Sequence, residues 1–111
     1  MIEIIIKNHL DFVLDEPVHL QKPSTSTGTY VVIEKTGSDE NNYLPSATFA
    51  FQSYAPSLYA AAALNEKVKQ AVKSLIELDE IRGVKLNSDC NFTDTTTKEY
   101  RYQAVFDIKH Y

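Results

Sequence analysis

The sequence predicts an α+β domain in which a mainly antiparallel sheet of about five strands carries two helices on one face. Apolar residues recur at helical spacing near the start of the chain and again in its middle, and they alternate with polar residues in three other segments. Of the 111 residues, 30 are Leu, Ile, Val or Phe, about 27%, which is typical of ordered domains. The length suits one core, so we expect a single domain over residues 1–111.

The first 22 residues are predicted to form a helix and a short strand. In the segment 1–13, apolar residues fall close to i, i+3, i+4, i+7 and i+8, which describes one stripe of a helix. The β-branched residues at 4–6 favour a strand instead, because branching at Cβ restricts helix rotamers. We follow the stripe. Pro17 blocks continuation of the helix, and residues 18–22 are predicted to be a strand closed by Pro23.

The next segments predict a hairpin with a long exposed tip. Residues 23–28 contain nothing to bury and should form an exposed loop. The β-rich run 29–35 and the alternating run 47–52 are the predicted strands. Residues 36–45 between them are polar, so we expect a loop there.

A long helix is predicted from about residue 57 to residue 79. Ser57 is a favoured N-cap, and Pro56 is compatible with the start of a helix. Apolar residues recur at helical spacing between 58 and 76, with charged residues on the other side. Gly83 marks the exit from the helix.

The last quarter of the chain predicts a second hairpin. Residues 84–92 and 100–108 both alternate in polarity, and a polar loop at 91–98 joins them. The buried side of the first strand is predicted to carry Val84, Leu86, Ser88, Cys90 and Phe92. Cys90 is therefore expected to fill part of the core.

The composition argues against several classes of function. Eleven Lys and Arg against 15 Asp and Glu give a net charge of −4, the opposite of the balance typical of proteins that grip nucleic acid. Cys90 is the only cysteine, which excludes an internal disulfide and suits a reducing compartment. The first 14 residues contain no apolar run of signal-peptide or membrane-spanning length. We expect a soluble intracellular protein.

No motif for catalysis, a metal or a cofactor stands out. His9, His19 and His110 lie in separate predicted elements, without a second ligand at metal-site spacing. The paired carboxylates are sequence neighbours at element ends, which does not give two carboxyls contrasting environments. With three glycines there is no phosphate-binding loop. We therefore expect no enzyme activity, no metal and no cofactor.

The two polar loops, 36–45 and 91–98, are each rich in Asn, Asp and Thr and lie at the tips of the predicted hairpins. A single loop of this kind is more often an ordinary surface turn. A ring-forming protein could instead use both loops to contact the layers above and below it.

Several segments carry a resemblance that spans nearly the whole chain. They are Met-Ile-Glu-Ile-Ile-Ile-Lys-Asn at 1–8, Tyr-Val-Val-Ile-Glu-Lys-Thr-Gly at 30–37, residues 47–64 with Gln-Ser-Tyr-Ala-Pro-Ser-Leu-Tyr at 52–59, and residues 86–106, including 91–97 and Tyr-Arg-Tyr-Gln-Ala-Val-Phe at 100–106. Together they resemble a small tail-module protein of long-tailed phages and prophages of Gram-positive bacteria. The resemblance is to the tail terminator, or tail-to-head joining, class.

The resemblance implies a structural role in the virion. Tail terminators form a hexameric ring that caps the tail tube, ends tail growth and presents a surface to the head. The implied partners are further copies of the chain, the major tail tube protein and a head-completion or connector protein. DNA would only pass in transit, with no membrane contact. The chain would act in the tail or neck of the virion, assembled in the cytoplasm of the bacterial host.

Two kinds of contact surface follow from this role. Axial or lumen contacts are predicted for the hairpin tips, at Asp39, Glu40, Asn41, Asn42, Tyr43, Thr93, Asp94 and Thr95. A subunit interface is predicted on the exposed sides of the long helix and the last strand, at Lys69, Lys73 and Arg101.

Two alternatives remain open at the level of the sequence. The chain could be a head-side connector or completion protein of the neck, which binds the head ring instead of the tube. It could also be a monomeric, host-directed binding module, for which Tyr43, Tyr54 and Tyr59 would be exposed anchors.

Overall fold

The computed structural model describes residues 2–21, 28–41, 44–93 and 100–111, with only the backbone for residues 38–41 and 44. The elements in chain order are α1 (Ile2–Val13), β1 (Val18–His19), β2 (Tyr30–Asn41), β3 (Leu44–Ala55), α2 (Leu58–Lys73), the 3₁₀ turn η1 (Ser74–Glu77), β4 (Ile81–Asn91) and β5 (Tyr100–His110). This order confirms the predicted succession of helix, strand, hairpin, long helix and hairpin.

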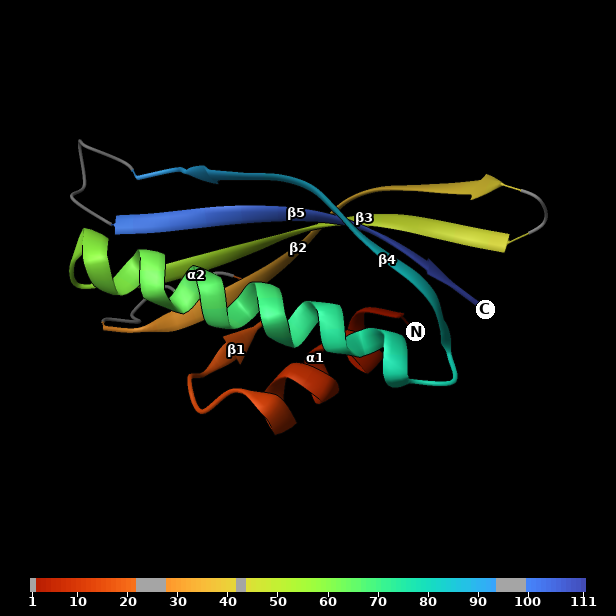
Figure 1. Cartoon of the computed structure of the whole chain (residues 1–111), viewed down its shortest axis with the longest axis horizontal. Coiled ribbons are helices and arrows are strands. Elements are labelled where there is room, and N and C mark those ends of the chain that lie inside the picture. The colour runs from red at the N-terminus through yellow and green to blue at the C-terminus, as the bar shows by residue number, and fades with distance from the viewer. Residues whose placement is uncertain (1, 22–27, 42–43, 94–99) are drawn as a thin grey trace.

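The five strands form one sheet in the order β1-β2-β3-β5-β4. The short strand β1 runs parallel to β2, and all other neighbours are antiparallel. Both helices lie on the same side of the sheet, and the β2–β3 hairpin reaches beyond the end of α2 (Figure 1). The predicted α+β architecture, with two helices on one face of a mainly antiparallel sheet, is therefore confirmed.

The core lies between the two helices and the sheet. Phe49 and Phe51 of β3 and Phe106 of β5 are fully buried on the face that meets the helices. The rings of Phe51 and Phe106 meet edge to face, with centroids 5.8 Å apart. Ile6 and Leu10 from the stripe of α1 complete the same cluster. The helical and strand periodicities thus converge on one buried layer.

The long helix starts where the sequence predicts and ends earlier. The Ser57 hydroxyl accepts a hydrogen bond from the Ala60 amide at 3.1 Å, which satisfies one of the free N–H groups of the first turn. At the other end, the Ser74 hydroxyl donates to the Ala71 carbonyl at 2.6 Å, and the chain continues as a 3₁₀ turn. The regular helix therefore stops at Lys73, short of residue 79.

The predicted loop at 36–45 is wrong for most of its length. β2 and β3 stay paired through the bulge between Lys35 and Gly37 as far as the pair Asn41 and Leu44. Backbone groups supply the hydrogen bonds of a ladder, so polar side chains do not prevent a strand from continuing. Of the strand predicted at 18–22, Val18 and His19 pair with β2 and residues 20–21 do not, while residue 22 lies outside the described residues.

The predicted burial of Cys90 is also wrong. A bulge between Leu86 and Ser88 inserts one residue into β4, which reverses the alternation of its side chains beyond that point. Leu86 pairs with buried Phe106, whereas Cys90 pairs with Gln103 on the other face and is exposed. The single cysteine is thus no part of the core.

We expect Phe106→Ala to lower the free energy of unfolding by about 3–5 kcal/mol, because it leaves a cavity beside Phe51. Phe12→Ala is the matched control. The Phe12 side chain is 90% exposed, so its loss should change stability by less than about 0.5 kcal/mol. Urea unfolding of both variants measures the difference, and equal losses would contradict the assigned core.

Candidate functional site

The sheet is open at both edges in the part of the chain that the structure describes. On one side, β1 covers β2 only at Val31 and Val32, and no strand pairs with residues 33–41 from that side. On the other side, β4 pairs with β5 alone. Open edges expose unpaired N–H and C=O groups that can bind another strand. These two edges are therefore the first candidates for contact with another chain.

An ion cluster fixes the edge strand β4 against α2. The Lys69 ammonium lies 2.6 Å from Asp89 Oδ2 and 2.8 Å from a Glu66 oxygen, and 13% of the Lys69 side chain is exposed. The buried Asn65 amide donates to Asp89 Oδ1 at 2.8 Å. Asn65 is a polar residue within the apolar stripe of α2, and this was the only sequence signal of the cluster.

The protonation of this cluster follows from its contacts. Partial burial alone would raise the pKa of Asp89, but hydrogen bonds from Lys69 and Asn65 and the charge of Lys69 outweigh it and hold that pKa below its ordinary value. Hydrogen bonds to Asp89 and Glu66 raise the pKa of Lys69. Both groups are therefore charged near neutral pH, and each charge has an oppositely charged partner in the same chain.

The helix-free face of the sheet holds a hollow of about 520 Å³ over β2, β3 and β5, with polar and apolar side chains in its lining. Arg101 Nη1 donates to the Tyr54 hydroxyl at 2.7 Å, and Arg101 Nε donates to the Phe92 carbonyl at 2.8 Å. The Tyr54 ring stacks on Tyr30 with centroids 4.6 Å apart. Tyr54 is 3% exposed, so the prediction that it is an exposed anchor is wrong.

A second hollow on the same face is rich in cations and borders the β4 edge. Its volume is about 610 Å³, and its charged lining residues are Arg82, Lys85, Asp107 and Lys109. Asp107 accepts hydrogen bonds from the Thr48 hydroxyl at 2.8 Å and from the Asn87 amide at 3.1 Å. The three cations therefore outnumber the one carboxylate beside this edge.

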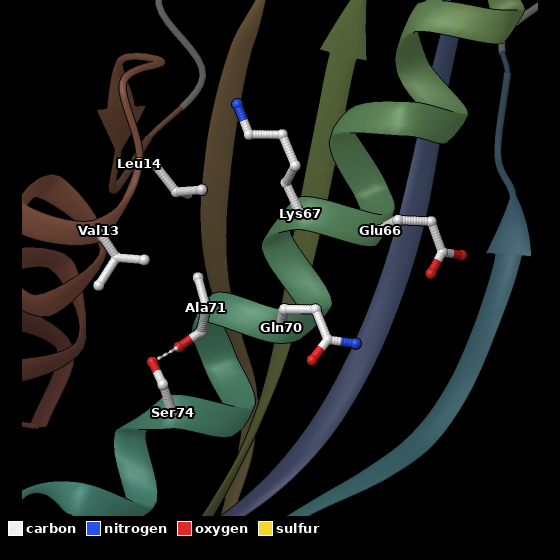
Figure 2. A pocket seen from close by; sticks show the side chains of 7 residues that line it. All are labelled: Val13, Leu14, Glu66, Lys67, Gln70, Ala71 and Ser74. Atoms are coloured by element: carbon white, nitrogen blue, oxygen red, sulfur yellow. Dashed lines mark hydrogen bonds between the residues drawn. The ribbon is translucent and has the colours of Figure 1, made fainter.

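An apolar groove of about 470 Å³ lies between the end of α1 and α2. Figure 2 shows Val13 and Leu14 on one side and the α2 side chains, including Ala71, on the other. At its rim, the Lys67 ammonium lies 2.7 Å from a Glu16 oxygen. The structure describes nothing that covers this groove.

Four of the residues predicted to contact axial neighbours are described by the structure, at the ends of two strands. Asp39, Glu40 and Asn41 are the last residues of β2, and Thr93 follows β4. The remaining members of the set lie outside the described residues; they are Asn42, Tyr43, Asp94 and Thr95. The Thr93 hydroxyl donates to Asn91 Oδ1 at 2.6 Å, a local contact at the end of β4.

The three residues predicted to form a subunit interface are not equivalent. Lys73 is exposed on α2. Lys69 is largely covered by its ion pairs, and Arg101 is bound to Tyr54 and Phe92 of its own chain. The structure does not bring the three together into one patch, and their contact with another subunit stays a prediction.

Two further properties of the described residues bear on the kind of site. No three of their His, Cys, Asp and Glu residues gather where they could hold a metal ion. None of their helices has the length and apolar character needed to cross a membrane. Among known proteins, no family model matches the chain, and no curated protein is significantly similar to it.

The ion cluster predicts a pH dependence of stability. Folding lowers the pKa of Asp89, so its ionised carboxylate contributes to the free energy of unfolding. This contribution is fully present above the ordinary pKa of an aspartate and is lost as the pH falls through the pKa of Asp89 in the folded state. The free energy of unfolding of the wild type should therefore fall between about pH 5 and pH 3. Asp89→Asn and Lys69→Met should both flatten part of that decline in urea unfolding. An unchanged slope in both variants would contradict the assigned cluster.

Proposed function

We propose that this chain is a structural protein of a phage tail, which forms a ring on the end of the tail tube, ends tail growth and joins the tail to the head. The resemblance over segments 1–8, 30–37, 47–64 and 86–106 suggests this role. The observation that best supports it is the sheet left open at both edges, since two different edges suit a head-to-tail ring.

A closed ring solves the problem that open edges create. Each copy would use one edge for the preceding neighbour and the other edge for the following one, so that closure leaves no edge free to aggregate. The net charge of −4 also suits a channel through which DNA passes without binding, because fixed phosphate contacts would hold it. The proposal includes no catalysis and no cofactor, and it places the protein in the virion tail or neck.

Native mass spectrometry of the purified chain, alone and with its tail tube protein, tests the ring. We expect sixfold assemblies, at least in the presence of the tube protein. Monomers under both conditions would contradict the proposal. Affinity capture with the tube protein and with the head-completion protein then separates the two positions, because capture of the head-completion protein alone would favour the head-side connector.

A monomeric binding module is the second candidate, and exposed aromatic side chains favour it. Phe12 near the end of α1 is 90% exposed, and Tyr59 at the start of α2 is 85% exposed. Aromatic residues of this kind often anchor interfaces. A phage that lacks the gene distinguishes the candidates, since the tail-ring role predicts overlong or headless tails and the binding module predicts normal particles.

A further inference from the structure

We infer that the β4 edge of one copy pairs with the β2 edge of a second copy, in an antiparallel ladder that continues the sheet from subunit to subunit. This inference rests on the proposed function, because it names the surface through which a ring would close. It commits to a second copy of the chain as the partner. Strand direction, strand level and charge all support this partner.

Strand direction follows from the order of the sheet. β2 is antiparallel to β3, β3 to β5, and β5 to β4, so β2 and β4 run in opposite directions. A rotation about an axis along the strands leaves their directions unchanged. When such a rotation places β4 next to β2 of a second copy, the two strands are antiparallel. That arrangement allows regular pairing of their free N–H and C=O groups.

The two edges also match in level and length. Residues that pair across the sheet lie at the same height along the strands, and we call this height their level. Three such rows run from β2 through β3 and β5 to β4. They are Ile33-Phe51-Ala104-Asp89, Gly37-Thr48-Asp107-Lys85 and Asp39-Ser46-Lys109-Gly83. The open part of β2 from 33 to 39 is therefore level with residues 83–89 of β4. Each stretch contains one bulge, between Lys35 and Gly37 and between Leu86 and Ser88. A second copy thus needs no axial shift to pair with this edge.

The short strand β1 sets the limit of the ladder. It occupies the edge of β2 at Val31 and Val32. Through the pairs across the sheet, these two residues are level with Asn91 and Cys90. The part of β4 that finds a free partner therefore ends near Asp89, the residue that Lys69 and Asn65 hold in place.

Charge favours the same arrangement. Arg82, Lys85 and Lys109 surround the hollow beside the β4 edge. In the second copy, the strand positions that would face this part of β4 are residues 39 and 40 of β2, and both are acidic in the sequence. Each exposed ion pair adds little to affinity, but opposite charges along facing edges fix the register and the choice of partner.

Cysteine cross-linking tests the ladder directly. Positions 37 and 85 share one level, but within one copy they are separated by β3 and β5. Three strand spacings amount to about 14 Å, which is beyond the ~7 Å limit between the Cα atoms of a disulfide. A bond between Cys side chains at these positions can only join two copies. Lys85 is exposed, and a Cβ at Gly37 would meet nothing within 4 Å, so both positions accept cysteine.

The cross-linking protein carries Gly37→Cys and Lys85→Cys in a Cys90→Ser background. Oxidised with the tail tube protein present, it should give a ladder of covalent oligomers on a non-reducing gel, up to six copies. The proteins with either cysteine alone should give no such ladder. Gly37→Cys with Lys73→Cys is the matched control. Lys73 is exposed on α2 and belongs to neither edge strand, so the edge pairing predicts no cross-link.

Charge reversal gives an independent test that needs no new bond. Lys85→Glu and Asp39→Lys should each raise the protein concentration needed for assembly by about tenfold, and their combination should restore assembly, because the attraction is rebuilt with the signs exchanged. Lys73→Glu makes the same change in net charge as Lys85→Glu. The sequence predicts Lys73 at a subunit interface on α2, whereas the edge pairing leaves α2 out of the contact and therefore predicts unchanged assembly. Thermal unfolding of each variant verifies that it is folded.

The outcomes separate the inference from the proposed function. Two outcomes would overturn the edge pairing and leave the proposed ring intact. In the first, rings form but positions 37 and 85 do not cross-link. In the second, Lys73→Glu disrupts the rings and Lys85→Glu does not. No assembly of the wild type, alone or with the tube protein, would overturn both. Cross-linking between positions 37 and 85 in open chains of copies that do not bind the tube protein would support the edge pairing and contradict the tail role.

Discussion

Phe49, Phe51 and Phe106 lie together on one face of the central strands, and the rest of the fold depends on keeping water from these three rings. α2 covers β3 and β5, while α1 adds Ile6 and Leu10 near β2. Because both helices are needed on this face, none of the described helices covers the other face. That face is stabilised instead by the stack of Tyr30 on Tyr54 and by the contacts of Arg101.

The placement of the helices also decides which edges stay open. α2 reaches β4 through the ion cluster of Lys69 and Asp89, which holds the edge strand from the helix side and leaves its outer backbone groups free. At the opposite edge, the two-residue strand β1 pairs only with Val31 and Val32, while α1 reaches along the helix face as far as Lys35, whose ammonium lies 4.0 Å from Glu3 Oε1. The sheet is thus well packed on its helix face and incomplete at its sides, which is the form expected of a unit that another copy extends.

The sequence predicts the parts of this fold that depend on local periodicity. The stripe in residues 1–13, the cap at Ser57 and the alternation around Phe49, Phe51 and Phe106 all correspond to the observed elements. The bulge after Leu86 could not be predicted, because a bulge depends on the partner strand, and it moved Cys90 to the exposed face. Lys69 was predicted to be exposed since its partner Asp89 is twenty positions away. Burial of Tyr54 likewise depends on Arg101, which lies on the neighbouring strand of the sheet but 47 positions away in the sequence.

In the proposed assembly, another copy of the chain completes the sheet at β2 and β4. Hydrogen exchange of backbone amides, followed by mass spectrometry in the monomer and in the assembled state, measures this most directly. If the edges pair, assembly slows exchange in the peptides that cover residues 33–41 and 81–89, because their free N–H groups acquire strand partners. Protection confined to α2, with exchange in both edge strands unchanged, would contradict the edge pairing.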